Sequence, residues 1–198
     1  RDGYIARVGW RPDGLLTAQL LSRDQSGLRL VSFAADGSST LLIAEHSEPW
    51  LNLAGDTHFL KDNSVVWTSE RTGFRHIYLH DAAGTPMRAL TEGDWVVTSL
   101  VDVDEESRTV FFIATRDGVS ERHLYGISLD GGEVTRLTSE PGYHSISISP
   151  NHSHFIDSWS SLHHAPRVAL RRMDGAFEAM IFENAGNTTA ALGLVAPE

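Results

Sequence analysis

The sequence predicts an all-β fold built from about four repeated four-stranded antiparallel units, and three observations support this prediction. First, the tetrapeptide Arg75–Tyr78 returns as Arg122–Tyr125, a shift of about 47 residues. Second, apolar and polar residues alternate with period two, and no segment shows a sustained 3.6-residue period. Third, a glycine recurs in a turn-like setting at nearly constant spacing, at Gly37, Gly84, Gly131 and Gly175.

The second and third repeats show the strand pattern most clearly. Ile77 and Leu79 alternate with His76, Tyr78 and His80, which predicts a strand with one buried face. Asp-Gly and Gly-Gly pairs supply residues that tolerate the positive φ of tight hairpins. We expect strands at 65–70, 74–80 and 87–91 in the second repeat, and at 109–115, 123–129 and 134–138 in the third.

Meanders that repeat about every 45 residues are typical of β-propeller blades. The predicted blades are residues 1–46, 47–93, 94–142 and 143–184, and 185–198 is expected to be a frayed tail. Both ends read like interior parts of a longer chain, so we expect an open half of a larger ring. Its exposed blade faces would favour self-association.

Composition narrows the possible functions. The 198 residues contain no cysteine, which excludes disulfides, thiol nucleophiles and Cys-ligated zinc. The net charge of −10 argues against nucleic-acid binding. No apolar run approaches the roughly 20 residues needed to cross a bilayer, so we expect no membrane partner. We expect no cofactor.

Histidines and tryptophans are the other candidate functional residues. No metal-binding spacing is present. We interpret His76 and His123, which recur with the repeat, as making the same structural hydrogen bond in each blade. His152 and His154 are expected on one strand face, and His163–His164 after a hairpin. Packing between sheets is expected for every tryptophan except Trp50, namely Trp10, Trp67, Trp95 and Trp159.

One segment resembles a known family. Trp67–Tyr78 is similar to the Trp-x-Ser-Glu-x-x-Gly-x-x-His-[Ile/Leu]-Tyr segment of the dipeptidyl peptidase IV family propeller. The similarity runs in order along nearly the whole chain, at Tyr4–Trp10, Trp50–Leu53, Leu90–Trp95, Glu121–Tyr125 and Ser145–Pro150.

The resemblance implies that this chain is the second half of an eight-bladed propeller that precedes an α/β-hydrolase domain. That hydrolase would carry a Ser-Asp-His triad and release N-terminal dipeptides with proline or alanine at the second position. The family also implies a dimeric parent exported from the cytoplasm, although the residues show neither property.

The chain departs from the family pattern at the positions that would carry chemistry. Ser128 lacks the Gly-x-Ser-x-Gly context of a nucleophile, so we expect no catalytic residue here. Glu105–Glu106 is interpreted as a solvated turn and not as the family's amine-binding glutamate pair. Ala54 stands where bacterial relatives often have histidine. Only Trp50 and Asn52 are predicted to face a substrate cavity.

The sequence leaves three hypotheses about function, of which the third, a complete small enzyme, has the least support. The first is the gating, cavity-forming half-propeller of a dipeptidyl peptidase IV-like serine peptidase, with the peptide N-terminus and a hydrolase domain in cis as partners. The second is a non-enzymatic TolB-like or WD-type scaffold that binds a protein.

Overall fold

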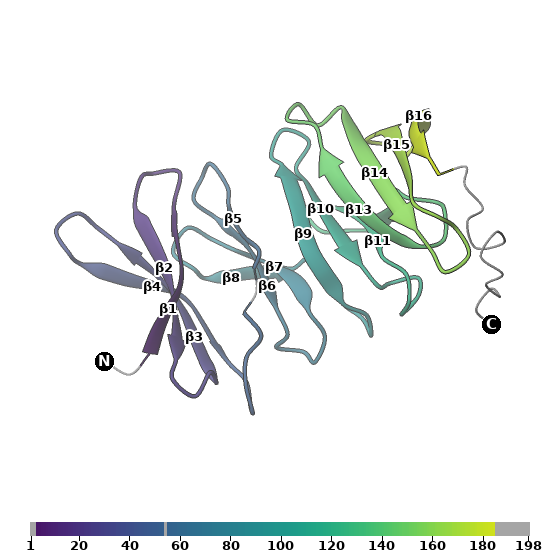
Figure 1. Cartoon of the computed structure of the whole chain (residues 1–198). Coiled ribbons are helices and arrows are strands. Elements are labelled where there is room, and N and C mark those ends of the chain that lie inside the picture. The colour runs from purple at the N-terminus through teal and green to yellow at the C-terminus, as the bar shows by residue number, and fades with distance from the viewer. Residues whose placement is uncertain (1–2, 54, 185–198) are drawn as a thin grey trace. The chain divides into compact units, whose positions relative to one another are not determined.

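A computed structural model describes residues 3–53 and 55–184, and all regular structure in these residues is β (Figure 1). Sixteen strands form four sheets of four strands each. Each sheet is an antiparallel meander in which strands adjacent in sequence are hydrogen-bonded neighbours. This confirms the predicted all-β fold with four-stranded propeller blades. No helix in the described residues is long and apolar enough to span a membrane.

Two compact units make up the chain, and the first consists of Arg1–Asp94 with Leu129–Gly131. It contains two sheets, which we call the first and second sheets. The first sheet is β1 (Gly3–Trp10), β2 (Leu16–Ser22), β3 (Gly27–Phe33) and β4 (Ser39–His46), and the second is β5 (Thr57–Phe59), β6 (Val65–Ser69), β7 (His76–His80) and β8 (Pro86–Ala89).

The second unit consists of Trp95–Ser128 and Gly132–Glu198, and contains the third and fourth sheets. The predicted tail, residues 185–198, lies outside the described residues. The third sheet is β9 (Val97–Asp104), β10 (Thr109–Ala114), β11 (His123–Ser128) and β12 (Thr135–Arg136), and the fourth is β13 (Tyr143–Ile148), β14 (His154–Ser160), β15 (Arg167–Arg172) and β16 (Phe177–Glu183).

Strands form where the repeat predicted them and differ only at their ends. One expectation about burial is wrong, because all five residues of β7 are buried and not only one face. The polar side chains on β7 are tolerated inside because they find partners. His76 is hydrogen-bonded to Thr91, and His80 Nδ1 lies 3.0 Å from the Gly84 carbonyl oxygen.

Each unit has a hydrophobic core between its two sheets. In the first unit Leu28 and Leu30 of the first sheet pack with Val65 and Trp67 of the second. In the second unit Phe111 and Leu124 of the third sheet pack with Phe155 of the fourth. Within each unit, therefore, one meander buries its apolar face against the next.

The recurring turn glycines have a structural role in this packing. Gly84 (φ +87°) lies between β7 and β8, and a Cβ atom there would overlap the Leu42 carbonyl of the first sheet. Gly175 (φ +86°) lies between β15 and β16, and a Cβ atom there would lie 2.6 Å from the Leu137 carbonyl oxygen beside the third sheet. The sheets approach this closely because these turns carry no side chain.

The tryptophan prediction is right for Trp67 and wrong for Trp10. Trp67 is buried in the core of the first unit, while the Trp10 side chain is 71% exposed. Trp10 lies at the end of β1 on the same face as Val8, which is also exposed. The opposite face of β1, which carries Arg7, is the one that points toward the second sheet. Arg7 is paired with Gln19 of β2, and Gln19 is hydrogen-bonded to Thr57 of the second sheet. The face that carries Trp10 therefore points away from the second sheet. Among the described residues, no other sheet covers this face, and the indole ring is exposed.

Candidate functional site

The segment that joins β4 to β5 contains both residues predicted to face substrate. We call residues 47–53 the 47–53 loop. Its backbone is tied to the β2–β3 turn, because the Ser47 amide donates to the Ser26 carbonyl (2.9 Å) and the Leu51 amide to the Gln25 carbonyl (2.8 Å). Leu51 and Leu53 also pack against the hydrophobic core of the first unit. The loop is therefore held firmly on the sheets.

Asn52 is fixed by a charged pair on the second sheet. Its Nδ2 donates to Glu70 Oε2 at 2.8 Å, and Arg75 Nη2 donates to Glu70 Oε1 at 3.1 Å. Glu70 directly follows β6 and Arg75 directly precedes β7, so the hairpin turn presents both. These three side chains help to line a cavity of about 110 Å³, which we call the Asn52 cavity.

A second carboxylate, Glu45, organises the inner wall of the Asn52 cavity. It accepts hydrogen bonds from Trp67 Nε1 (3.1 Å), Ser69 Oγ (2.7 Å) and the Arg71 guanidinium. Arg71 also lies over the Tyr78 ring, 4.2 Å from its centroid. A carboxylate with three donors and a stacked guanidinium keeps its position, so the wall is polar and pre-organised.

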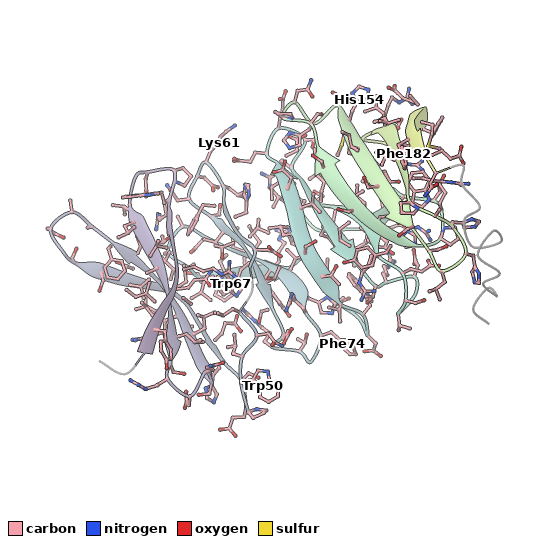
Figure 2. The ribbon with its side chains drawn as sticks, in the orientation of Figure 1. Trp50, Lys61, Trp67, Phe74, His154 and Phe182 are labelled. Atoms are coloured by element: carbon pink, nitrogen blue, oxygen red, sulfur yellow. The ribbon has the colours of Figure 1, made fainter. Side chains whose placement is uncertain are left out.

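Trp50 occupies a different environment from Asn52. Its side chain is 60% exposed and does not line the Asn52 cavity, and Figure 2 shows it projecting from the loop. The structure therefore brings Asn52, but not Trp50, into a cavity. Substrate contact by either residue stays a prediction. Ala54 lies outside the described residues.

Sequence reasoning missed Glu70 and Arg75 as partners of Asn52. Both lie inside the Trp67–Tyr78 segment that resembles the peptidase family. The signal was a carboxylate and a guanidinium flanking a turn glycine, Gly73, which predicts side chains close together at one end of a hairpin.

The interpretation of the recurring histidines is confirmed. His76 Nδ1 lies 3.1 Å from Thr91 Oγ1, and His123 Nδ1 lies 3.0 Å from Thr138 Oγ1. In both blades this threonine hydroxyl also accepts a hydrogen bond from the backbone amide of the residue after the histidine. The repeated histidine–threonine pair thus ties the third strand of a blade to the segment that ends its fourth strand.

His152 and His154 do not share a strand face, contrary to the prediction. His152 lies in the β13–β14 turn with φ +48°, so only His154 is on β14. His152 Nε2 lies 3.1 Å from Asp102 Oδ2, and His154 Nε2 lies 3.1 Å from Glu178 Oε2. Within residues 3–53 and 55–184, no group of three or more His, Cys, Asp or Glu side chains is placed to hold a metal ion.

The rejected catalytic candidates occupy hairpin structure. Ser128 ends β11 and leads into a turn, not into a helix. Glu105 and Glu106 lie in the turn between β9 and β10, where Glu106 is exposed. Ser128 therefore does not stand at the strand-to-helix turn of a nucleophile elbow.

A buried ionic network in the second unit was not predicted from the sequence. His144 Nδ1 and Arg171 Nε lie 2.7 and 2.9 Å from the two carboxylate oxygens of Asp157, and all three side chains are buried. Arg171 also reaches the Glu140 carboxylate at 2.5 Å. Burial opposes the charged form of Glu140, but the hydrogen bonds from Arg171 and Ser139, together with the charge of Arg171, outweigh it and lower the pKa of Glu140 to about 2. The network is internal to the protein and fixes β13, β14 and β15 to one another.

Known proteins of one family match this chain. The family model described as the dipeptidyl peptidase IV (DPP IV) N-terminal region matches residues 1–166. Human dipeptidyl peptidase 8 is 30% identical over 226 residues, covering 86% of this chain and 25% of that protein. A probable dipeptidyl peptidase 4 of Aspergillus flavus is 29% identical over 168 residues, covering 78% of this chain and 22% of its own length.

A solved structure agrees with these matches. The crystal structure of Porphyromonas gingivalis dipeptidyl peptidase 4 matches 98% of this chain with a TM-score of 0.89 and 25% identity, and 28% of that protein is covered. The chain thus spans about a quarter of the length of these relatives. With the family model matched over residues 1–166, the chain belongs to the dipeptidyl peptidase IV N-terminal region family.

Proposed function

We propose that this chain is the second half of the propeller of a serine-type dipeptidyl peptidase that releases X-Pro or X-Ala dipeptides from peptide N-termini. Its blades form part of the wall of the chamber through which an extended peptide reaches a hydrolase domain in cis. Folded proteins are excluded by size. The matches to proteins named dipeptidyl peptidases support this proposal.

The 47–53 loop is the part of this chain that we propose to contact the peptide. The observation that carries this assignment is the hydrogen bond between Asn52 and Glu70, which both line the Asn52 cavity. Glu70 takes one Asn52 N–H, which leaves the amide oxygen as an acceptor for a peptide N–H. Trp50, exposed on the same loop, offers an aromatic surface for an apolar side chain of the peptide.

Steady-state kinetics of the full-length enzyme test this assignment. Asn52→Ala should raise KM for an X-Pro peptide about three- to tenfold, since one neutral hydrogen bond contributes about 0.5–1.5 kcal/mol. The value of kcat should change little, because the contact is remote from the reacting bond. Trp50→Ala should act in the same direction on peptides longer than a dipeptide.

A matched control removes an exposed side chain elsewhere. Leu162, which is 78% exposed in the β14–β15 turn, should tolerate Leu162→Ala with unchanged KM. If Asn52→Ala and Trp50→Ala both leave KM at the control value while folding normally, the loop does not contact substrate.

We further propose that the chain by itself is inactive, because no nucleophile context is present in its sequence. The purified 198-residue chain should not hydrolyse Gly-Pro-p-nitroanilide. Turnover that a serine-directed phosphonate blocks would contradict the proposal.

A further inference from the structure

The first unit contains a second and larger cavity, of about 400 Å³, which we call the Arg7 cavity. It lies between the first and second sheets, and Gly55, Thr57 and Phe59 form one wall. This volume is in the range of small-molecule sites in proteins. The cavity is lined by Arg7, Val8, Gly9, Trp10, Thr17, Gln19, Leu30, Gly55, Thr57 and Phe59.

Arg7 brings a positive charge to this cavity, and its guanidinium has no charged partner among residues 3–53 and 55–184. Arg7 pairs with Gln19 across β1 and β2, so the two side chains share the face that points to the second sheet. Arg11, Arg71 and Arg75 in the same unit each form an ion pair with a carboxylate. The Arg7 guanidinium forms no ion pair or hydrogen bond with any other residue in the described part of the chain. An incoming anion would therefore not compete with any of these described residues for the Arg7 guanidinium.

Gln19 supplies a second, independent observation. The residue is only 4% exposed, and its Nε2 donates to Thr57 Oγ1 at 2.9 Å. Its Oε1 is buried and has no hydrogen-bond partner among the described residues. A buried acceptor without a donor carries an uncompensated cost of desolvation. An N–H group placed in the cavity would remove that cost.

We propose that the Arg7 cavity binds a short peptide by its carboxylate. The Arg7 guanidinium pairs with the carboxylate, Gln19 Oε1 accepts a peptide N–H, and Leu30 with Phe59 contacts an apolar side chain. A carboxylate fits better than a phosphate dianion, because the cavity presents a single cation. The inference goes beyond the proposed function, since it requires binding and no catalysis.

Calorimetric titration of the 198-residue chain with the dipeptide Gly-Leu tests the proposal. Saturable binding is expected below about 10 mM. Arg7→Gln should weaken it about 10- to 100-fold, the value of a charge-assisted hydrogen bond. Gln19→Leu should weaken it less. Arg29→Gln is the matched control, because Arg29 is an exposed arginine on the opposite face of the same sheet and should leave affinity unchanged.

Three further ligands identify the group that is bound. Gly-Leu-amide, which lacks the carboxylate, should bind at least about tenfold more weakly than Gly-Leu. Gly-Glu-amide binding as tightly as Gly-Leu would show that a side-chain carboxylate serves equally well. Inorganic phosphate binding more tightly than Gly-Leu would overturn the choice of ligand.

Absence of saturable binding, or binding that Arg7→Gln leaves unchanged, would overturn the site itself and leave a cavity that holds water only. Arg7 is exposed, so this variant should fold, and circular dichroism checks that it does. The result is independent of the kinetics of Asn52→Ala, so failure of one proposal is distinguishable from failure of the other.

Discussion

Replacement of the turn glycine Gly84 by alanine is expected to separate the first and second sheets. At φ +87° an alanine pays about 1–2 kcal/mol for left-handed backbone geometry. Its Cβ atom would also overlap the Leu42 carbonyl, which belongs to the neighbouring sheet and cannot rotate away. Overpacking of this kind costs about 1–3 kcal/mol more. We therefore expect Gly84→Ala to lower the free energy of unfolding by about 2–5 kcal/mol.

Gly37 is the matched control, because it occupies the same turn of the first sheet with φ +84° but has no atom within 4 Å of its would-be Cβ. Gly37→Ala should lower the free energy of unfolding only by the cost of the left-handed backbone conformation, about 1–2 kcal/mol. Urea denaturation followed by tryptophan fluorescence measures both, since Trp67 is buried in the core of this unit. Equal destabilisation by the two substitutions would refute the argument that this turn needs glycine because the sheets pack closely.

The buried polar groups of the second unit lead to three further outcomes. Asp157→Asn removes the carboxylate that His144 and Arg171 share, and should lower the free energy of unfolding by about 3–5 kcal/mol in urea denaturation. Asp174→Asn in an exposed turn should change it by no more than about 0.5 kcal/mol, and similar effects of the two substitutions would contradict the network's role. Thr138→Val removes the hydroxyl that is hydrogen-bonded to His123 and to the backbone amide of Leu124, and should lower the free energy of unfolding by about 1–3 kcal/mol. An unchanged midpoint of urea denaturation would contradict a stabilising role for the repeated histidine–threonine pair. Burial lowers the pKa of His123 below its usual 6.5, so as the pH falls the unfolded chain binds a proton at this histidine at a higher pH than the folded chain does. The folded state should therefore lose stability as the pH drops below about 6.5. His123→Gln should make the melting temperature less dependent on pH between about 7 and 5. An unchanged pH dependence in that variant would mean that His123 does not contribute.

The features that local sequence determines were predictable. Period-two alternation located β6, β7, β10 and β11, and the recurring glycines located the turns, because strand pairing and positive φ depend on a few adjacent residues. The recurrence of His76 and His123 predicted that both make the same structural hydrogen bond, although their partners Thr91 and Thr138 were not predicted.

Features that depend on packing between distant strands were not predictable. The exposed position of Trp10 depends on which sheet face has a neighbour, and the burial of both faces of β7 depends on partners outside the strand. The Asn52–Glu70 bond and the Asp157–Arg171 pair join residues on different strands or loops. No local period records which side chains meet across these distances.

Photo-cross-linking most directly tests the claim that this chain binds the peptide substrate through the 47–53 loop. An X-Pro peptide that carries a benzophenone side chain after the proline would be irradiated on the full-length enzyme, and the labelled fragments identified by mass spectrometry. The account predicts labelling within residues 47–53, at Trp50 or Asn52, and loss of this label when excess unlabelled peptide competes. Competable labelling confined to other segments, with none in the loop, would contradict it.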